Sequence, residues 1–266
     1  MSLQQIQSLM LNLSIKPQLS NQLFADPSSV QASYDLADHE LQAALQLQAR
    51  DLEAFQTHVA LKRLNRLAMP YVTRSLSLFS SSSRARLLRE FVTIHEMKQN
   101  FWMQNIITFL DFLADKATGD KHGDLQREVI AFEKWVYESC RATDEEVSGT
   151  GLRVASRVRV ATFQLPGELL IDGKFQEALP ELFGTQGFVL AQWNGAEVDL
   201  YEIDSGYYDF LKQGIGRMFT SQELLVLAEG IAVRYEERTA HEMIEELYEA
   251  GILVTHGKEV KSWLEV

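Results

Sequence analysis

Histidine, cysteine and acidic side chains are the first candidates for chemistry in this sequence. The six histidines are His39, His58, His95, His122, His241 and His256. No pair of them has His-x-x-x-His spacing and none completes Glu-x-x-His, the patterns that put two metal ligands on one helix face. The only cysteine, Cys140, cannot close a disulfide within the chain or begin a cysteine-based metal site. We therefore expect no metal site and no metal cofactor in this chain.

Nucleophile and phosphate-binding motifs are also missing from the sequence. There is no Gly-x-x-x-x-Gly-Lys-Ser/Thr loop and no Gly-x-Ser-x-Gly elbow. Cys140 follows Phe132 and Val136 on one apolar helix face, which is typical of a core residue rather than a nucleophile. Neighbouring acids such as Glu245 and Glu246 point apart on a helix. The sequence therefore predicts a chain that is not itself an enzyme.

The first half of the chain must position its side chains on helices. Asp26-Pro27 is typical of a helix start, with an aspartate cap followed by proline. The serine run 80–83 is a loop that caps another helix, and Pro70 predicts a break. Trp102, Ile106, Phe109 and Leu113 follow the helical period on the most apolar segment. We expect residues 1–142 to form an antiparallel array of about six or seven helices.

The second half changes to short strands and then helices. Residues 188–193 and 197–203 flank Asn194-Gly195, a strong signal for a β-hairpin. Three helices should follow, the first from Asp204, the others from Thr220 and Thr239 with capping boxes to Glu223 and Glu242. The third helix should end at Gly251, before a last hairpin that turns at His256-Gly257.

This order of elements is typical of a winged-helix domain. Residues 143–152 are polar and contain glycine, so we expect the domain boundary there. The predicted fold class is α+β, mostly α: an all-helical domain over residues 1–142, followed by a winged-helix-like, peptide-recognition domain over residues 153–266.

The charge of the chain is unevenly distributed. Residues 1–142 hold 15 basic and 15 acidic side chains, whereas residues 143–266 hold 10 and 22, so the net charge of −12 lies in the second half. Such a domain repels phosphate backbones, which argues against a nucleic-acid partner. The N-terminus lacks a signal-peptide pattern, and no apolar run approaches the roughly 20 residues that cross a bilayer. We expect a cytoplasmic protein without a membrane partner.

The strand 197–203 and the helix 239–250 are the expected binding elements. A terminal strand leaves backbone N–H and C=O groups unpaired, and an extended peptide can add there as a further strand. A purely structural role for both elements remains the alternative. The acidic side chains on them favour a peptide with basic residues. The candidate peptide-binding residues are Val198, Leu200, Tyr201, Glu202, His241, Glu245 and Tyr248.

Basic residues cluster in the second quarter of the chain. Residues 50–90 carry eight basic and three acidic side chains. They are either a solvated helix face or a docking surface for an acidic partner protein. The candidate docking residues are Arg63, Arg66, Arg84, Arg86 and Arg89.

A resemblance to a known family joins these observations. The matching residues are Pro17, Leu19, Phe24, Asp26-Pro27, Tyr34 and Leu36, followed by Leu52, Phe55, Leu61-Lys62-Arg63 and Pro70. This pattern resembles the N-terminal domain of the partner proteins of multinuclear non-haem iron oxidases, such as those of the methanobactin and 3-thiaglutamate pathways. The second half resembles the C-terminal domain of the same family, a winged-helix relative of the peptide-recognition elements of peptide-modifying enzymes.

The resemblance implies a function for the chain. It would be a non-catalytic subunit that holds the leader segment of a ribosomally made precursor peptide and docks on a TIM-barrel iron oxidase. The iron and its ligands would belong to that partner. Two alternatives stay open: a winged-helix transcriptional regulator, which needs a basic recognition helix, and a stand-alone helical-bundle metal oxygenase, which needs inward-facing Glu and His sets.

Overall fold

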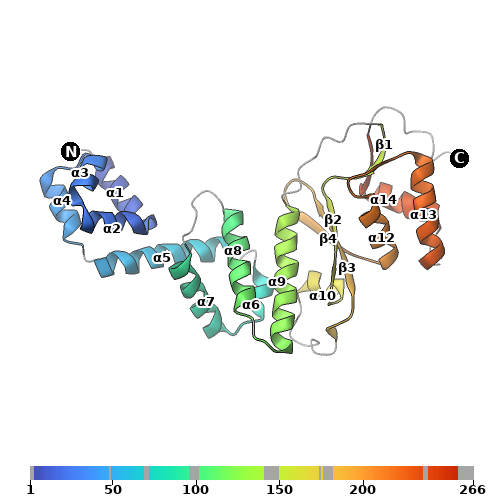
Figure 1. Ribbon diagram of the computed structural model, residues 1–266, viewed down its shortest axis with the longest axis horizontal. Coiled ribbons are helices and arrows are strands. Elements are labelled where there is room, and N and C mark those ends of the chain that lie inside the picture. Colours follow the sequence, from blue (N-terminus) through green and yellow to red (C-terminus); the bar gives the residue numbers. More distant parts are fainter. Residues whose placement is uncertain are drawn as a thin grey trace. The chain divides into compact units, whose positions relative to one another are not determined.

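The computed structural model contains many helices and two small antiparallel sheets, which confirms the α+β, mostly α class (Figure 1). It describes residues 3–47, 49–68, 72–95, 102–140, 150–173, 175, 182–235 and 239–256. The chain divides into two compact units, Met1–Phe112 and Leu113–Val266.

The N-terminal unit is helical throughout its described residues. Asp26 accepts a hydrogen bond from the Ser29 amide with Pro27 in the first turn, and Ser80 accepts one from the Ser83 amide, which confirms both predicted caps. The break predicted at Pro70 lies outside the described residues. The helices are α1 (Leu3–Ile15), α2 (Pro17–Ala25), α3 (Pro27–Tyr34), α4 (Asp38–Leu45), α5 (Ala49–Ala68), α6 (Thr73–Ser77), α7 (Ser81–Ile94) and α8 (Trp102–Asp115).

Two groups of apolar side chains hold this unit together. One joins α1 to α4 with the start of α5, through residues such as Leu13, Leu23 and Val30, which are fully buried. The other is aromatic: Phe91 of α7 lies 4.9 Å from Phe109 of α8, measured between ring centroids, in an edge-to-face arrangement. Such pairs contribute beyond the area they bury. The apolar side chains expected on α8 therefore include Phe109, which packs against α7.

The C-terminal unit contains one helix before its sheets and four described helices around them. The helices are α9 (Lys121–Ser139), α10 (Gly167–Asp172), α12 (Ser205–Gly214), α13 (Ser221–Tyr235) and α14 (Ala240–Glu249). One sheet has the order β2 (Val158–Phe163), β3 (Gly187–Trp193), β4 (Val198–Ile203). The other has the order β5 (Met218–Phe219), β1 (Gly151–Val154), β6 (Leu253–His256), with all pairs antiparallel.

The local predictions for this unit are confirmed where they can be checked. The hairpin pairs Trp193 with Val198 across a turn in which the Asn194 side chain accepts hydrogen bonds from the amides of Ala196 and Glu197. Thr239 and Glu242 form the predicted capping box of α14. A second box at Thr220 begins α13. The final hairpin predicted beyond His256 lies outside the described residues.

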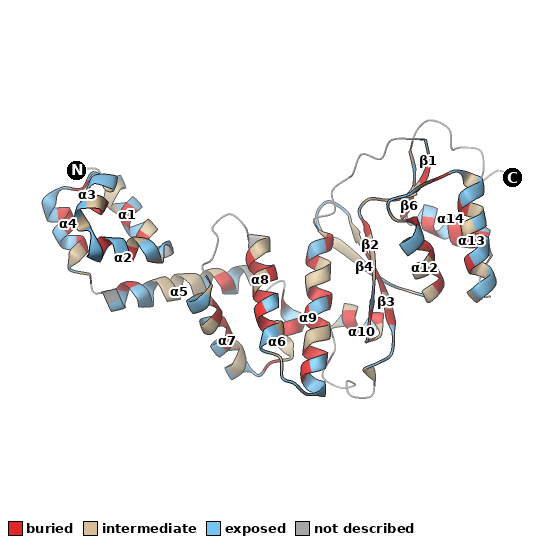
Figure 2. Cartoon of the chain, viewed as in Figure 1, coloured by how far each residue is buried: buried red, intermediate tan, exposed pale blue. Residues whose placement is uncertain are grey.

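The sheet β2–β3–β4 is covered on both faces. On one face, the Phe163 ring contacts Phe132 and Trp135 of α9, with centroids 5.3 and 5.6 Å apart. On the other, Phe188 contacts Tyr208 of α12 at 5.2 Å. Buried positions recur along α9 and β3 accordingly (Figure 2). Neighbouring residues of a strand point to opposite faces, so Tyr201, paired with Leu190, lies on the α12 face.

The division of the chain differs from the predicted one. We expected domains over 1–142 and 153–266, with a linker at 143–152, whereas the division falls between Phe112 and Leu113. The reason is the packing of α9 against the sheet through Phe132 and Trp135. Helical periodicity shows that α9 has an apolar face but not which neighbour covers it. Residues 141–149 lie outside the described part.

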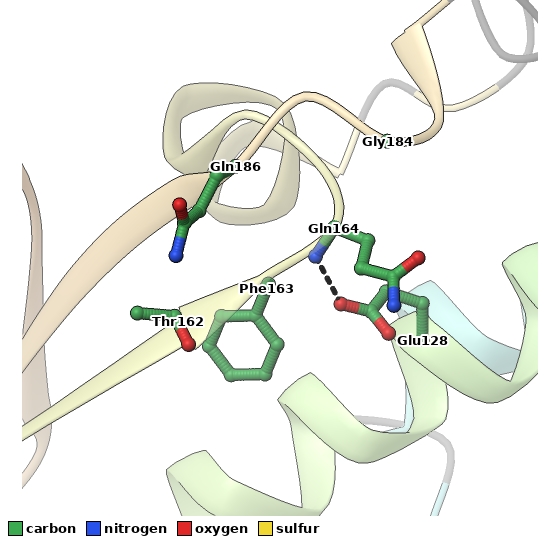
Figure 3. Close-up of a pocket in the computed structure, with 6 residues that line it drawn as sticks. All are labelled: Glu128, Thr162, Phe163, Gln164, Gly184 and Gln186. Atoms are coloured by element: carbon green, nitrogen blue, oxygen red, sulfur yellow. Dashed lines mark hydrogen bonds between the residues drawn. The ribbon is translucent and has the colours of Figure 1, made fainter.

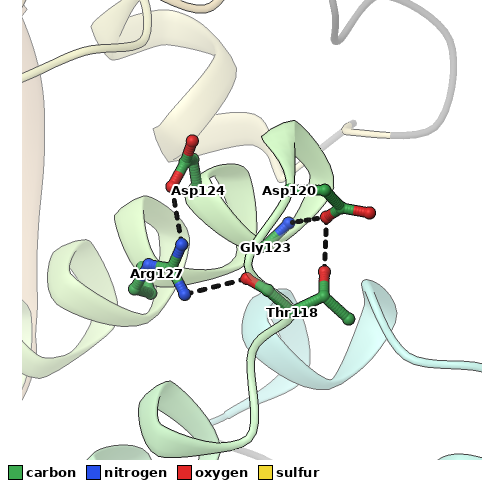
Figure 4. Close-up of polar contacts among 5 residues, drawn as sticks. All are labelled: Thr118, Asp120, Gly123, Asp124 and Arg127. Atoms are coloured by element: carbon green, nitrogen blue, oxygen red, sulfur yellow. Dashed lines mark hydrogen bonds and ion pairs between the residues drawn. The ribbon is translucent and has the colours of Figure 1, made fainter.

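The start of α9 is held by a polar cluster (Figure 4). The carboxylate of Asp120 accepts hydrogen bonds from the Thr118 hydroxyl at 2.5 Å and from the Gly123 amide at 2.9 Å. These bonds, the Thr118 bond first, lower the pKa of Asp120 below its usual value. Arg127 reaches back to the Asp124 carboxylate and to the carbonyl oxygen of Thr118. The loop before α9 is therefore fixed from both sides.

Candidate functional site

The outer edge of β4 is the first component of the candidate site. Among the described strands, β4 pairs only with β3. The Trp193 amide donates to the Arg157 carbonyl at 3.0 Å, on the β2 side, while the Asn194 amide donates to Glu197 at 3.1 Å. The backbone N–H and C=O groups alternate in direction along an antiparallel strand. Those of Trp193 therefore point to β2, and those of its partner Val198 point to the outer side of β4.

The same alternation places every second residue of β4. The N–H and C=O groups of Val198, Leu200 and Glu202 point outward, and those of Asp199, Tyr201 and Ile203 point to β3. In the described part of the chain, no hydrogen bond is seen to the outward amides. β4 thus offers three donors and three acceptors to an added strand.

The opposite edge of this sheet is treated differently (Figure 3). At the end of β2, the backbone amide of Gln164 donates to the carboxylate of Glu128, which comes from α9. A polar cavity of about 480 Å³ lies beside this contact, lined by Glu128, Thr162, Phe163, Gln164, Gly184 and Gln186. A charged side chain at a strand end is one way in which proteins limit pairing with another chain. This contact occupies one outward amide just beyond β2, and no such contact is seen for the outward amides of β4 in the described residues.

A cavity between β4 and α14 is the second component of the site. Its volume is about 230 Å³, below the size of typical small-molecule pockets and suited to one side chain. The floor is apolar, and the exposed residue Glu246 brings its carboxylate to the lining, whereas the Glu202 carboxylate lies near Gly167 of α10. The lining residues are Leu190, Tyr201, Glu202, Ile203, Tyr207, Glu246, Leu247, Ala250 and Ile252.

Two tyrosines shape this cavity. Tyr201 is 48% exposed, which is unusual for a large aromatic side chain on a strand. Tyr207 is buried, and its hydroxyl donates a hydrogen bond to the Glu246 carboxylate. This bond ties α12 to α14 and holds the Glu246 carboxylate at the cavity.

The predicted peptide-binding residues are only partly brought together. Tyr201 and Glu202 line the cavity. Val198 and Leu200 are half-buried on the same strand, with side chains on the α10 face, while their backbone groups form the free edge. The predicted helix residues His241, Glu245 and Tyr248 are exposed on the side of α14 away from the cavity.

The cavity therefore lies along the same helix as the predicted residues, but on its other side. The cavity uses Glu246, Leu247 and Ala250 instead. Leu247 belongs to the buried face of α14, so the apolar spacing of Met243 and Leu247 was the available signal. Leu190, Tyr207 and Ile252 come from three other elements, and no sequence pattern links them to the strand edge.

The predicted docking arginines do not form one set. Arg66 on α5 and both Arg86 and Arg89 on α7 are exposed, and Arg63 is half-buried. Arg84 is used within the fold: its Nε donates to the Phe79 carbonyl at 2.7 Å and its Nη2 to the Ser77 carbonyl at 3.3 Å. Arg84 lies on the face of α7 opposite to Arg86 and Arg89, because of the helical period.

The metal-binding and nucleophilic side chains of the described residues are the remaining candidates for chemistry. No group of three or more His, Cys, Asp or Glu side chains there is arranged to hold a metal ion. Burial raises the pKa of the Cys140 thiol, and the thiol donates to the Val136 carbonyl. Within the described ranges, none of the helices is both long and apolar enough to pass through a bilayer.

Comparison with known proteins adds no relative. Neither the protein-family models nor the curated proteins that we searched match this chain. The function must therefore be inferred from the geometry of the β4 edge and the cavity next to it.

Proposed function

We propose that this chain is a non-catalytic, peptide-binding subunit. It captures an extended segment of a ribosomally made precursor peptide on the β4 edge and presents that peptide to an iron-dependent oxidase. The observation that supports this most is the outward row of backbone groups on Val198, Leu200 and Glu202, next to a cavity of side-chain size. Strand addition with a pocket for alternate side chains is a recurring mode of peptide recognition.

The order of elements supports a winged-helix-like domain for this role. The hairpin β3–β4 precedes three helices, α12, α13 and α14, with the two-residue strand β5 between the first two, and β6 follows them. In this arrangement the third strand and the third helix enclose the cavity. The exposed side of α14 carries Glu242, Glu245 and Glu249. Such a helix would repel the phosphates of DNA, so the domain is better suited to a peptide than to a duplex.

The partner enzyme belongs to the proposal as well. The resemblance of the N-terminal residues implies a TIM-barrel iron oxidase as the docking partner, with the iron held there. Arg66, Arg86 and Arg89 are exposed on the N-terminal unit and are suited to an acidic surface. Because Arg84 is tied to two carbonyl oxygens of its own chain, we assign it to the fold rather than to docking.

The peptide-binding role can be tested without knowing the natural peptide. The full chain is used to select from a phage-displayed library of random linear peptides, and an enriched peptide is synthesised with a fluorescent label. The Kd is then measured by fluorescence anisotropy for wild type and for Leu200→Pro. Proline removes the outward N–H, which the fold does not use, and is tolerated on edge strands.

The expected result is a Kd at least about tenfold weaker for Leu200→Pro. The matched control is Leu200→Val, which keeps the N–H and suits a strand, and which should retain binding. Circular dichroism checks that both variants are folded. Failure to enrich any peptide, or equal Kd values for wild type and folded Leu200→Pro, would refute strand addition at β4.

The docking role has its own test. The chain is co-expressed with a TIM-barrel iron oxidase of the proposed class, and co-purification is measured for wild type, for Arg86→Glu with Arg89→Glu, and for the control Lys212→Glu in the C-terminal unit. We expect the double reversal to reduce recovery of the oxidase and the control to leave it unchanged. Full recovery with the double variant would exclude this surface as the docking site.

A further inference from the structure

The cavity beside β4 has an unusual combination of walls. Leu190, Leu247 and Ile252 form buried apolar surface. Glu246 of α14 brings its carboxylate to this apolar surface, whereas the Glu202 carboxylate lies near Gly167 of α10, on the other face of the sheet. A cavity made only for an aliphatic side chain would gain nothing from a carboxylate, since enclosing it beside an apolar group removes water without supplying a partner.

The position of one carboxylate is fixed by the fold. Tyr207 is buried and donates its hydroxyl to Oε2 of Glu246. A glutamate on an exposed helix face would otherwise sample several rotamers, and ordering it costs side-chain entropy. Here the fold already meets part of that cost, so a cationic ligand finds an oriented acceptor.

The added strand determines which peptide residue reaches the cavity. Residues directly opposite each other in a sheet have side chains on the same face. Tyr201 lies on the face that carries α12 and the cavity. The peptide residue that pairs with Tyr201 therefore directs its side chain toward Glu246.

We propose that this cavity is a subsite for one lysine or arginine of the captured peptide, the residue that pairs with Tyr201. The inference rests on the proposed function, because it requires a strand on β4. The aliphatic part of the side chain packs against Leu247, Ala250 and the Tyr201 ring, and its cationic group binds the Glu246 carboxylate. The excess of acidic side chains in residues 143–266 also favours a positively charged ligand.

A double-mutant cycle tests the subsite. The labelled peptide selected above is compared with a version whose basic residue is replaced by norleucine, a chain of similar length without charge. Each is titrated against wild type, Glu246→Gln and Glu245→Gln. Glutamine retains an oxygen that can accept from Tyr207, so the tie between helices is kept. Glu245 is the matched control because it removes the same charge from the same helix, outside the cavity.

We expect norleucine to weaken the Kd about tenfold in wild type and in Glu245→Gln, and by less than about threefold in Glu246→Gln, since a charge-assisted hydrogen bond is lost only once. Selected peptides without a basic residue at this position, or equal effects of the Glu246 and Glu245 changes, would overturn the subsite while leaving strand addition intact. If Leu200→Pro binds like wild type, both proposals fail.

Discussion

The clearest test of the structure itself is the substitution Gly123→Ala at the start of α9 (Figure 4). A Cβ built on Gly123 would lie 1.7 Å from the carbonyl oxygen of Thr118, a contact that no real side chain makes. The obstacle is backbone, so the loop must move. Movement of Thr118 would break its hydrogen bonds with Arg127 and Asp120.

The expected cost follows from this geometry. Forcing an extra carbon into a close-packed position costs about 1–3 kcal/mol, and the lost hydrogen bonds place the value in the upper part of that range. Chemical denaturation in urea, followed by circular dichroism, measures it for the full chain. With a slope of about 2 kcal/mol per M, the midpoint of the affected transition should fall by about 1 M.

A second glycine four residues earlier provides the control. A Cβ at Gly119 would meet no atom within 4 Å. Gly119→Ala should be neutral or stabilise by about 0.5 kcal/mol, since alanine restricts the unfolded chain. We therefore predict that Gly123→Ala lowers the free energy of unfolding and that Gly119→Ala does not. Equal midpoints for Gly123→Ala and wild type would refute the described geometry of the α9 start.

Three further predictions concern the C-terminal unit. Phe132→Ala should lower the free energy of unfolding by about 3–5 kcal/mol and reduce the protection of the β2 and β3 amides from hydrogen exchange. Unchanged protection would show that α9 does not pack on the sheet. Glu128→Ala should speed exchange of the Gln164 amide, which loses its acceptor, and an unaltered rate would exclude the contact. Since the folded-state pKa of Asp120 lies below its unfolded value, its contribution is present above that value and lost as pH falls through the folded pKa. The Tm gap between wild type and Asp120→Asn should therefore close below about pH 4, and a gap constant down to pH 2 would contradict the assignment.

Features determined by a few neighbouring residues could be predicted from the sequence. The Asp26 cap, the hairpin at Asn194 and the capping box at Thr239 all form as expected. Each depends on hydrogen bonds between residues at most three positions apart, so the sequence itself contains both partners of the contact. The short helix α6 was harder to recognise, because a helix of fewer than two turns shows little periodicity. The expected six or seven helices over residues 1–142 are nine in the described residues.

Features determined by distant contacts could not be predicted. The apolar face of α9 is visible in the sequence, but its packing on Phe163 is not, so the domain boundary was placed after α9 instead of before it. The candidate site likewise combines a local feature that could be predicted with distant contacts that could not. β4 was identified from its pattern, whereas the cavity depends on Tyr207 and Ile252, which lie in segments that no local signal connects. His241 and Tyr248 were chosen for their chemistry, and their exposure on the far side of α14 is a tertiary property.

The two edges of the β2–β3–β4 sheet finally explain why the binding site should be at β4. An exposed strand edge invites pairing with other chains, and proteins usually cover it. At the end of β2, the Gln164 amide is bound by Glu128, which is held on a helix whose aromatic residues pack on the sheet. At β4, the outward amides of Val198, Leu200 and Glu202 show no equivalent contact in the described part of the chain, and a half-exposed tyrosine lies beside a small cavity. A strand edge without such a contact, with an oriented carboxylate beside it, is suited to receive a strand from another molecule.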